Sequence, residues 1–124
     1  MQERPDTGRT EMTDKELLEL AAKAAGYDVK PHGNAKRSRD LHFTYRGTNW
    51  NPLTDDGDAL RLAVKLGMKD YFSVEVQTSC VQATALEPWE HCEYEEYKTQ
   101  DPYAATRRAI VRAAAEMGKN NAAD

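Results

Sequence analysis

Three aspartates, Asp55, Asp56 and Asp58, crowd around Gly57 in the segment WNPLTDDGDALRLAVKLGM. Carboxylates at this density could bind calcium or magnesium, or act as a catalytic acid pair. A calcium loop of the EF-hand type needs oxygen ligands at alternating positions and a Glu six residues after its glycine. Here Asp55 and Asp56 are adjacent and Ala63 occupies the later position. The pattern therefore fails as a calcium loop, and nothing nearby marks the bound phosphate that would accompany magnesium.

The three aspartates are also explained if a helix begins at this point of the chain. Pro52 signals a turn, because proline disfavours helical geometry in the residue before it. Thr54 or Asp55 suits the N-cap, and Asp58 follows Asp55 at the spacing of a capping box. Acids in a first turn also favour the positive end of the helix dipole. We therefore predict that these aspartates cap a helix without binding metal, and that Trp50 packs the entry to it.

The histidines and cysteines contain the ingredients of a zinc site or a thiol nucleophile. No Cys-x-x-Cys or His-x3-His pair supports zinc, however, and neither cysteine has the sequence context of a nucleophile. Two cysteines in a chain without a secretory leader are expected to be free thiols. We therefore predict no catalytic residue, no metal site and no cofactor. The side chains concerned are His32, His42, Cys80, His91 and Cys92.

A basic segment, KPHGNAKRSRDLHFTYR, runs from Lys30 to Arg46 with Phe43 and Tyr45 interleaved. Basic and aromatic side chains together are typical of single-stranded nucleic-acid binding. However, Phe43 and Tyr45 lie on the alternation that should face the core. A solvated basic loop is therefore the favoured interpretation, and nucleic acid is not the expected partner.

An acidic and aromatic segment lies between Glu87 and Tyr97. It holds five glutamates and no Lys or Arg, interrupted by three large aromatic residues. Trp and Tyr carry much of the binding energy at interfaces, and carboxylates favour encounter with a basic surface. The alternative interpretation is an edge strand guarded by charge. We predict a contact face for a basic patch on a host protein, formed by Trp89, Glu90, Glu93, Tyr94, Glu95 and Tyr97.

Three amphipathic segments are expected to form helices around these side chains. Thr13 and Glu16 form a capping box before the first, and Asp101 caps the third. The third is expected to stop at Gly118. The second is apolar over a wide arc, which indicates a mostly buried helix lying on a sheet. The expected helices are Asp14–Ala25, Asp56–Leu66 and Pro102–Met117.

Strands are indicated by alternation of apolar and polar residues. Tyr71–Gln77 and Val81–Ala85 alternate and are joined by a short turn, which favours antiparallel pairing. Further strands are expected near Leu41–Arg46, Cys92–Tyr97 and, less regularly, Tyr27–Lys30. A small antiparallel sheet layered with three helices is an α+β domain. We expect almost complete burial of Leu60, Leu66, Val74, Val76 and Ile110.

Length and composition limit the classes of protein. The chain has 124 residues, 40% hydrophobic and 31% charged, with a net charge of -4. This supports one domain with a modest core, expected over residues 13–118 between disordered tails at 1–12 and 119–124. No apolar run approaches the length of a membrane span, and no leader precedes the first helix. The expected location is therefore the cytoplasm, without a membrane partner.

Three blocks of the sequence resemble a known family: MTDKELLELAAKAAGY, WNPLTDDGDALRLAVKLGM and DPYAATRRAIVRAAAEMG. They are similar to the phage alpha-beta-alpha sandwich domain family of small phage and prophage proteins. The blocks cover both ends and the middle of the part expected to be ordered, and their order matches. The resemblance implies an α-β-α layered fold and a prophage origin. It brings no biochemical activity and no catalytic or ligand residues.

The expected function is therefore that of a small, non-enzymatic prophage accessory protein that binds a host protein and modulates a host function or defence. The alternative is a module that binds a small, nucleotide-like ligand. It would use Trp50 for stacking and Arg107 or Arg108 for phosphate. No glycine-rich phosphate cradle supports this alternative.

Overall fold

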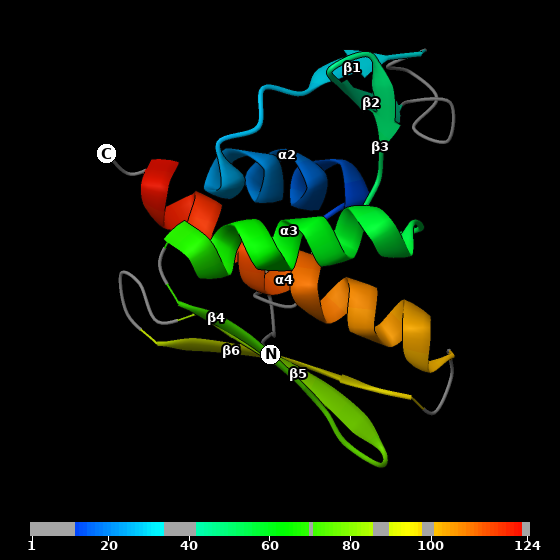
Figure 1. Ribbon diagram of the computed structural model, residues 1–124, viewed down its shortest axis with the longest axis vertical. Helices are drawn as coiled ribbons and strands as arrows, with labels where there is room; N and C mark the ends of the chain where they lie inside the picture. The colour runs from blue at the N-terminus through cyan, green and yellow to red at the C-terminus, as the bar shows by residue number, and fades with distance from the viewer. Residues whose placement is uncertain (1–11, 34–41, 70, 86–89, 98–100, 123–124) are drawn as a thin grey trace, which may run out of the picture.

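The computed structural model describes residues 12–33, 42–69, 71–85, 90–97 and 101–122, with side chains up to residue 119 (Figure 1). These residues form three helices and six strands. The helices are α2 (Asp14–Ala25), α3 (Asp56–Lys69) and α4 (Pro102–Ala122). The strands are β1 (Lys30–His32), β2 (His42–Tyr45), β3 (Thr48–Trp50), β4 (Phe72–Val76), β5 (Cys80–Ala85) and β6 (His91–Glu96).

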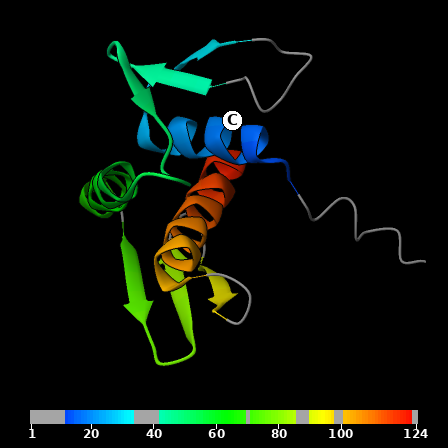
Figure 2. The ribbon, with the colours of Figure 1, turned by 90° about the vertical axis from the view of Figure 1, so that its right-hand side faces the viewer.

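Among the described residues, the strands form two antiparallel sheets of three strands, ordered β1-β2-β3 and β4-β5-β6. The helices lie between the two sheets, with the first sheet beside α2 and the second beside α3 and α4 (Figures 1 and 2). The predicted α+β class, the three helices and the antiparallel pairing are confirmed. The strands divide between two sheets rather than one, so the layering follows the expected sandwich only roughly.

The second sheet rests on α4 through small side chains. Val81 and Ala83 of β5 are buried against the alanines at positions 105, 109 and 113 of α4. Small residues allow the helix axis to approach the sheet closely. The opposite face of the sheet carries alternating polar residues, and neither view shows a described element covering it.

The first sheet contains a hairpin that the sequence did not predict. Tyr45 pairs with Thr48, leaving Arg46 and Gly47 as a two-residue turn with φ of 55° and 80°. Positive φ at both positions is the geometry of a type I′ turn, in which glycine suits the second position. Asn49 lies opposite Thr44 in β3. The strand expected at Tyr27–Lys30 is displaced to β1, an edge strand, where Pro31 is tolerated.

Close contact between α2 and α4 forms the centre of the core. A Cβ atom at Gly118 would lie 2.0 Å from the carbonyl oxygen of Leu20, so only glycine permits this approach. The expected stop at Gly118 is therefore wrong. The helix runs four residues further to Ala122, so residues 119–122 are helical rather than a disordered tail. At the other end, Met12 packs against the core, and the rest of the expected N-terminal tail lies outside the described residues.

The burial predictions hold for some residues and fail for others. Leu66 and Ile110 are almost fully buried as predicted, whereas Val74 is only half-buried. Two predictions are wrong: Leu60 is 64% exposed and Val76 is 66% exposed. Val76 is the last residue of an edge strand. Leu60 points away from the core because α3 buries only one side.

The cysteines are free thiols as predicted, with Cys80 buried and Cys92 exposed. Within the described residues, no helix is long and apolar enough to cross a membrane.

Candidate functional site

The aspartates at the start of α3 act as caps and structural anchors. The Asp55 carboxylate accepts a hydrogen bond from the Asp58 backbone N–H at 2.8 Å, which confirms Asp55 as the N-cap. Asp58 is itself nearly buried and accepts from the Asn51 N–H at 2.9 Å and from Arg61 at 2.8 Å. The hydrogen bond to Asp58 raises the pKa of Arg61 above its ordinary value. These carboxylates therefore hold the turn before α3 and the first turn of the helix.

Strand alternation divides the acidic and aromatic segment between two faces. Glu93 and Glu95 face α4, where the Arg112 guanidinium bonds Glu93 at 2.9 Å and also bonds Glu95. Tyr94 lies on the opposite, open face and is 53% exposed. The prediction of one shared contact face is therefore corrected, because side chains alternate across a strand. Arg112 thus connects α4 to β6.

The remaining members of that segment also separate. The Tyr97 hydroxyl lies within hydrogen-bond distance of the carbonyl oxygens of Gln77 (3.0 Å) and Cys80 (2.7 Å), so it fastens β6 to the β4–β5 hairpin. Glu90 is exposed just before β6, and Trp89 lies outside the described residues. Partner binding by the exposed members, Glu90 and Tyr94, stays a prediction.

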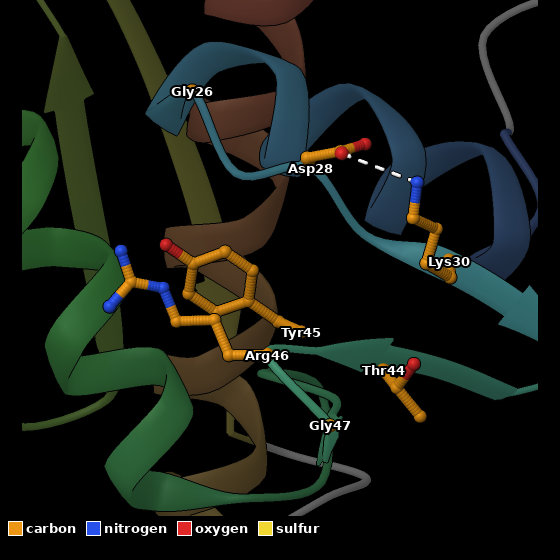
Figure 3. Close-up of a pocket in the computed structure, with 7 residues that line it drawn as sticks. All are labelled: Gly26, Asp28, Lys30, Thr44, Tyr45, Arg46 and Gly47. Atoms are coloured by element: carbon orange, nitrogen blue, oxygen red, sulfur yellow. Dashed lines mark hydrogen bonds and ion pairs between the residues drawn. The ribbon is translucent and has the colours of Figure 1, made fainter.

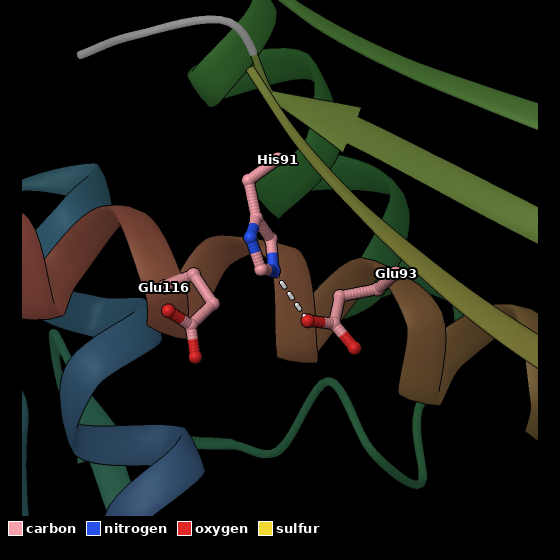
Figure 4. A group of neighbouring side chains, drawn as sticks. All are labelled: His91, Glu93 and Glu116. Carbon is pink, nitrogen blue, oxygen red and sulfur yellow. Dashed lines mark hydrogen bonds and ion pairs between the residues drawn. The ribbon is translucent and has the colours of Figure 1, made fainter. Parts of the chain in front are cut away.

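A cluster of potential metal ligands lies between β6 and α4. His91 and Glu93 project from the same face of β6, and Glu116 projects from α4 towards them (Figure 4). One nitrogen or oxygen atom from each side chain lies within 4.8 Å of the others. His91 Nε2 and Glu93 Oε2 are 2.5 Å apart. Zinc motifs with short spacing do not predict this group, because Glu116 is distant from His91 and Glu93 in the chain.

An open cavity of about 490 Å³ lies between the C-terminal end of α2 and the first sheet (Figure 3). Tyr45 contributes an aromatic side chain, and Lys30 and Arg46 contribute positive charge. The Arg46 guanidinium lies 5.4 Å from the centre of the Tyr45 ring, within cation–π distance. The full lining is Gly26, Asp28, Lys30, Thr44, Tyr45, Arg46 and Gly47.

The residues predicted for a nucleotide-like ligand do not line this cavity. Trp50 is only 4% exposed and packs edge-on against Tyr27, so it is not available for stacking on a ligand. Its predicted packing role before α3 agrees with this burial. Arg107 donates to the Leu53 carbonyl oxygen at 2.8 Å and bonds Asp56, while Arg108 pairs with Asp14. Both arginines therefore connect helices.

An apolar stripe lies on the outer side of α3. Leu60, Val64 and Met68 are 64%, 53% and 80% exposed, and they recur every four residues on one side of the helix. We refer to these three residues as the α3 stripe. Figure 2 shows α3 end-on at the left edge of the molecule, with α2 and α4 to its right. The wide apolar arc of this helix therefore has one buried side and one exposed side.

Comparison with known proteins returns no family model, no characterised relative and no solved structure that matches the chain. The resemblance to the phage alpha-beta-alpha sandwich family is therefore still a prediction.

Proposed function

We propose that this chain is a non-enzymatic accessory protein that acts by binding another protein through the α3 stripe. The observation that carries the proposal is the exposure of three large apolar side chains in register on one helix. Scattered exposed apolar residues are normal on a protein surface, but a contiguous exposed patch is typical of an interaction site.

The spacing of the stripe suits recognition of an apolar helix or groove. Side chains four residues apart form a ridge along a helix, and such ridges pack into the grooves of a partner helix. The unbranched methionine at position 68 supplies adaptable apolar area there. The α3 stripe therefore offers a ridge two turns long to a partner.

The positive side chains beside the α3 stripe favour a partner that has acidic residues around its own apolar contact surface. Lys65 and Arg61, of which Arg61 also bonds Asp58, are exposed and follow Val64 and Leu60 by one position, so they lie along one edge of the stripe. Opposite charges around an apolar contact accelerate association and exclude wrong partners. The surface expected earlier, on β6, was acidic and called for a basic partner. The proposed surface calls for the opposite sign.

The origin and location of the protein are part of the proposal. The resemblance to small phage and prophage proteins supports a host protein in the bacterial cytoplasm as the partner. Modulation of a host function or defence is the corresponding role, supported by that analogy alone.

Affinity capture from bacterial lysate with three immobilised forms tests the proposal. They are the wild type, a Leu60→Ser/Met68→Ser variant and a Tyr94→Ala variant that alters the open face of the second sheet. We expect the wild type and Tyr94→Ala to retain the same protein and the stripe variant to lose it. Loss only with Tyr94→Ala would move the contact to the second sheet and contradict the proposal.

Light scattering of the purified chain distinguishes a foreign partner from a second copy. In a two-fold antiparallel pairing of α3 with itself, Arg61 and Lys65 would face their own counterparts, and like charges repel. We therefore expect a monomer. A dimer that Leu60→Ser/Met68→Ser dissociates would mean that the stripe serves self-association instead.

The cavity beside Tyr45 supports a second candidate function, binding of a small anionic ligand. Its volume lies in the range of ligand sites, and Arg46 and Lys30, of which Lys30 also bonds Asp28 in the lining at 3.3 Å, supply cations next to an aromatic ring. A thermal-shift screen against nucleotides and sugar phosphates tests it. A ligand-induced rise in Tm that Lys30→Gln abolishes would support this function, and the absence of any shift would exclude the compounds screened.

A further inference from the structure

The cluster of His91, Glu93 and Glu116 combines three side chains that metal sites use, and they come from two different elements. Alternation along β6 places His91 and Glu93 on the face towards α4, and α4 presents Glu116 across the gap. In Figure 4 the His91 ring lies between the two carboxylates. The three side chains are 32%, 12% and 26% exposed. They are thus partly shielded, with one side open to solvent.

We propose that these three side chains bind a divalent transition-metal ion, with Zn²⁺ preferred over Mg²⁺ and Ca²⁺. An imidazole nitrogen favours transition metals, whereas Mg²⁺ and Ca²⁺ favour sites made only of oxygen ligands. One nitrogen and two carboxylate oxygens match the ligand types of three-residue zinc sites, in which water fills the fourth position.

The distances permit coordination with side-chain movements alone. Ligand atoms around a tetrahedral zinc ion are roughly 3.3 Å apart, given metal–ligand distances of about 2.0–2.1 Å. The three candidate atoms already lie within 4.8 Å of one another, and His91 and Glu93 are closer than the bound geometry requires. For coordination, the His91 and Glu93 side chains must therefore move slightly apart, and the Glu116 side chain must approach them.

Arg112 does not belong to the proposed ligands, but it orients one of them, Glu93. Its guanidinium bonds Glu93 Oε1 at 2.9 Å, while Glu93 Oε2 faces His91. A carboxylate held in this way presents its second oxygen in a fixed direction, as outer-shell partners do in metal sites. Lys119 lies 3.3 Å from a Glu116 oxygen. Arg112 and Lys119 together offset the charge of the two carboxylates, so we expect moderate affinity rather than that of a closed structural site.

An imidazole nitrogen that coordinates a metal ion must be deprotonated, so metal ions compete with protons for such a site. Binding is therefore expected to release protons and to weaken as the pH falls. The bound ion would connect β6 to the C-terminal half of α4, about one helical turn beyond Arg112.

Calorimetric titration of the full chain with Zn²⁺, Mn²⁺, Mg²⁺ and Ca²⁺ at pH 7.5 tests the proposal. We expect one equivalent of Zn²⁺ to bind and to raise Tm, with Mg²⁺ and Ca²⁺ at least tenfold weaker. His91→Asn and Glu116→Gln should each weaken Zn²⁺ binding at least tenfold with unchanged circular dichroism, and wild-type affinity should fall between pH 7.5 and pH 5.5.

Two control variants exclude other zinc ligands of the chain. His32 and His42 stack with ring centres 5.6 Å apart, and Cys92 is exposed. We expect His42→Asn and Cys92→Ser to bind Zn²⁺ as the wild type does. Loss of binding with either control but not with His91→Asn, or no saturable Zn²⁺ binding at all, would overturn the proposal and leave the three side chains as an ion-pair network.

Discussion

Gly118 has no Cβ atom, and this allows α2 and α4 to pack closely. Its added Cβ would lie 2.0 Å from the Leu20 carbonyl oxygen, which is backbone and cannot rotate away. We therefore expect Gly118→Ala to lower the free energy of unfolding by about 3 kcal/mol. Gly67→Ala is the matched control, because its Cβ would make only an ordinary contact, 3.6 Å from the Phe72 carbonyl oxygen.

In that control, alanine should raise stability by about 0.5–1 kcal/mol, since it replaces glycine inside a helix without strain. Urea denaturation of both variants measures the two effects. Equal effects of the same sign would show that Gly118 has no special packing role.

The cap of α3 gives a second prediction at the residue scale. Asp55 makes the capping hydrogen bond at 2.8 Å, whereas the Thr54 hydroxyl makes only a long contact of 3.5 Å to the Asn51 carbonyl oxygen. We expect Asp55→Ala to reduce the free energy of unfolding by about 1 kcal/mol, and Thr54→Ala to change it little. A larger loss with Thr54→Ala, again from urea denaturation, would reverse this assignment.

The Tyr27 phenol makes stability depend on alkaline pH. Burial, followed by the neighbouring Tyr45, raises its pKa above the ordinary value of about 10. The folded protein therefore keeps this proton at a pH where the unfolded chain releases it. The contribution of Tyr27 to the free energy of unfolding is fully present below the ordinary pKa. It is lost as the pH rises through the pKa that Tyr27 has in the folded protein. Melting curves between pH 8 and pH 11 should show a smaller decline for Tyr27→Phe, and an identical decline would contradict the assignment.

Residue roles could be predicted from the sequence where they depend on near neighbours. Asp55 was found because a cap acts within one helical turn. The role of Gly118 was not found, because the same glycine serves as a helix stop or as a contact point depending on what packs beside it. Glu93 and Glu95 were assigned to an exposed face because Arg112, the side chain that binds both, comes later in the chain.

At the scale of elements, α3 shows two apolar sides with different roles. Leu62 is fully buried, whereas Leu60 is largely exposed. We expect Leu62→Ala to cost about 2–5 kcal/mol through the cavity it leaves. Leu60→Ala should lower the free energy of unfolding by less than about 0.5 kcal/mol, because Leu60 is exposed. The predicted burial of Leu60 would have implied a large loss instead. Thermal unfolding of the two variants compares them directly, and similar losses would place Leu60 in the core.

Capping residues and alternation predicted the three helices and the main strands, but not how the strands group. The capping box at Thr13 and the alternation of Tyr71–Gln77 are local signals, and both elements form as expected. Division into two sheets depends on α3, which separates β3 from β4 in the chain, and on the α2–α4 contact between them. Pairing between distant strands has no comparable local signature.

At the scale of the whole molecule, α2 and α4 fill the centre, two small sheets lie on opposite sides, and α3 lies at the edge (Figure 2). This arrangement leaves the outer side of α3 uncovered by any described element. Its apolar side chains are not needed for the core, which the buried side of the same helix supplies through Ala59, Leu62 and Leu66. The α3 stripe is therefore available as the contact surface that the proposed function requires.

Site-specific photo-crosslinking tests that claim most directly. A photoreactive phenylalanine analogue is placed at Val64, in the centre of the stripe, and in a separate form at Tyr103, which is 71% exposed on α4. Irradiation in bacterial cells is predicted to give an adduct of discrete mass from position 64 and none from position 103. An adduct from position 103 alone, or no adduct from position 64, would contradict the α3 stripe as the binding surface.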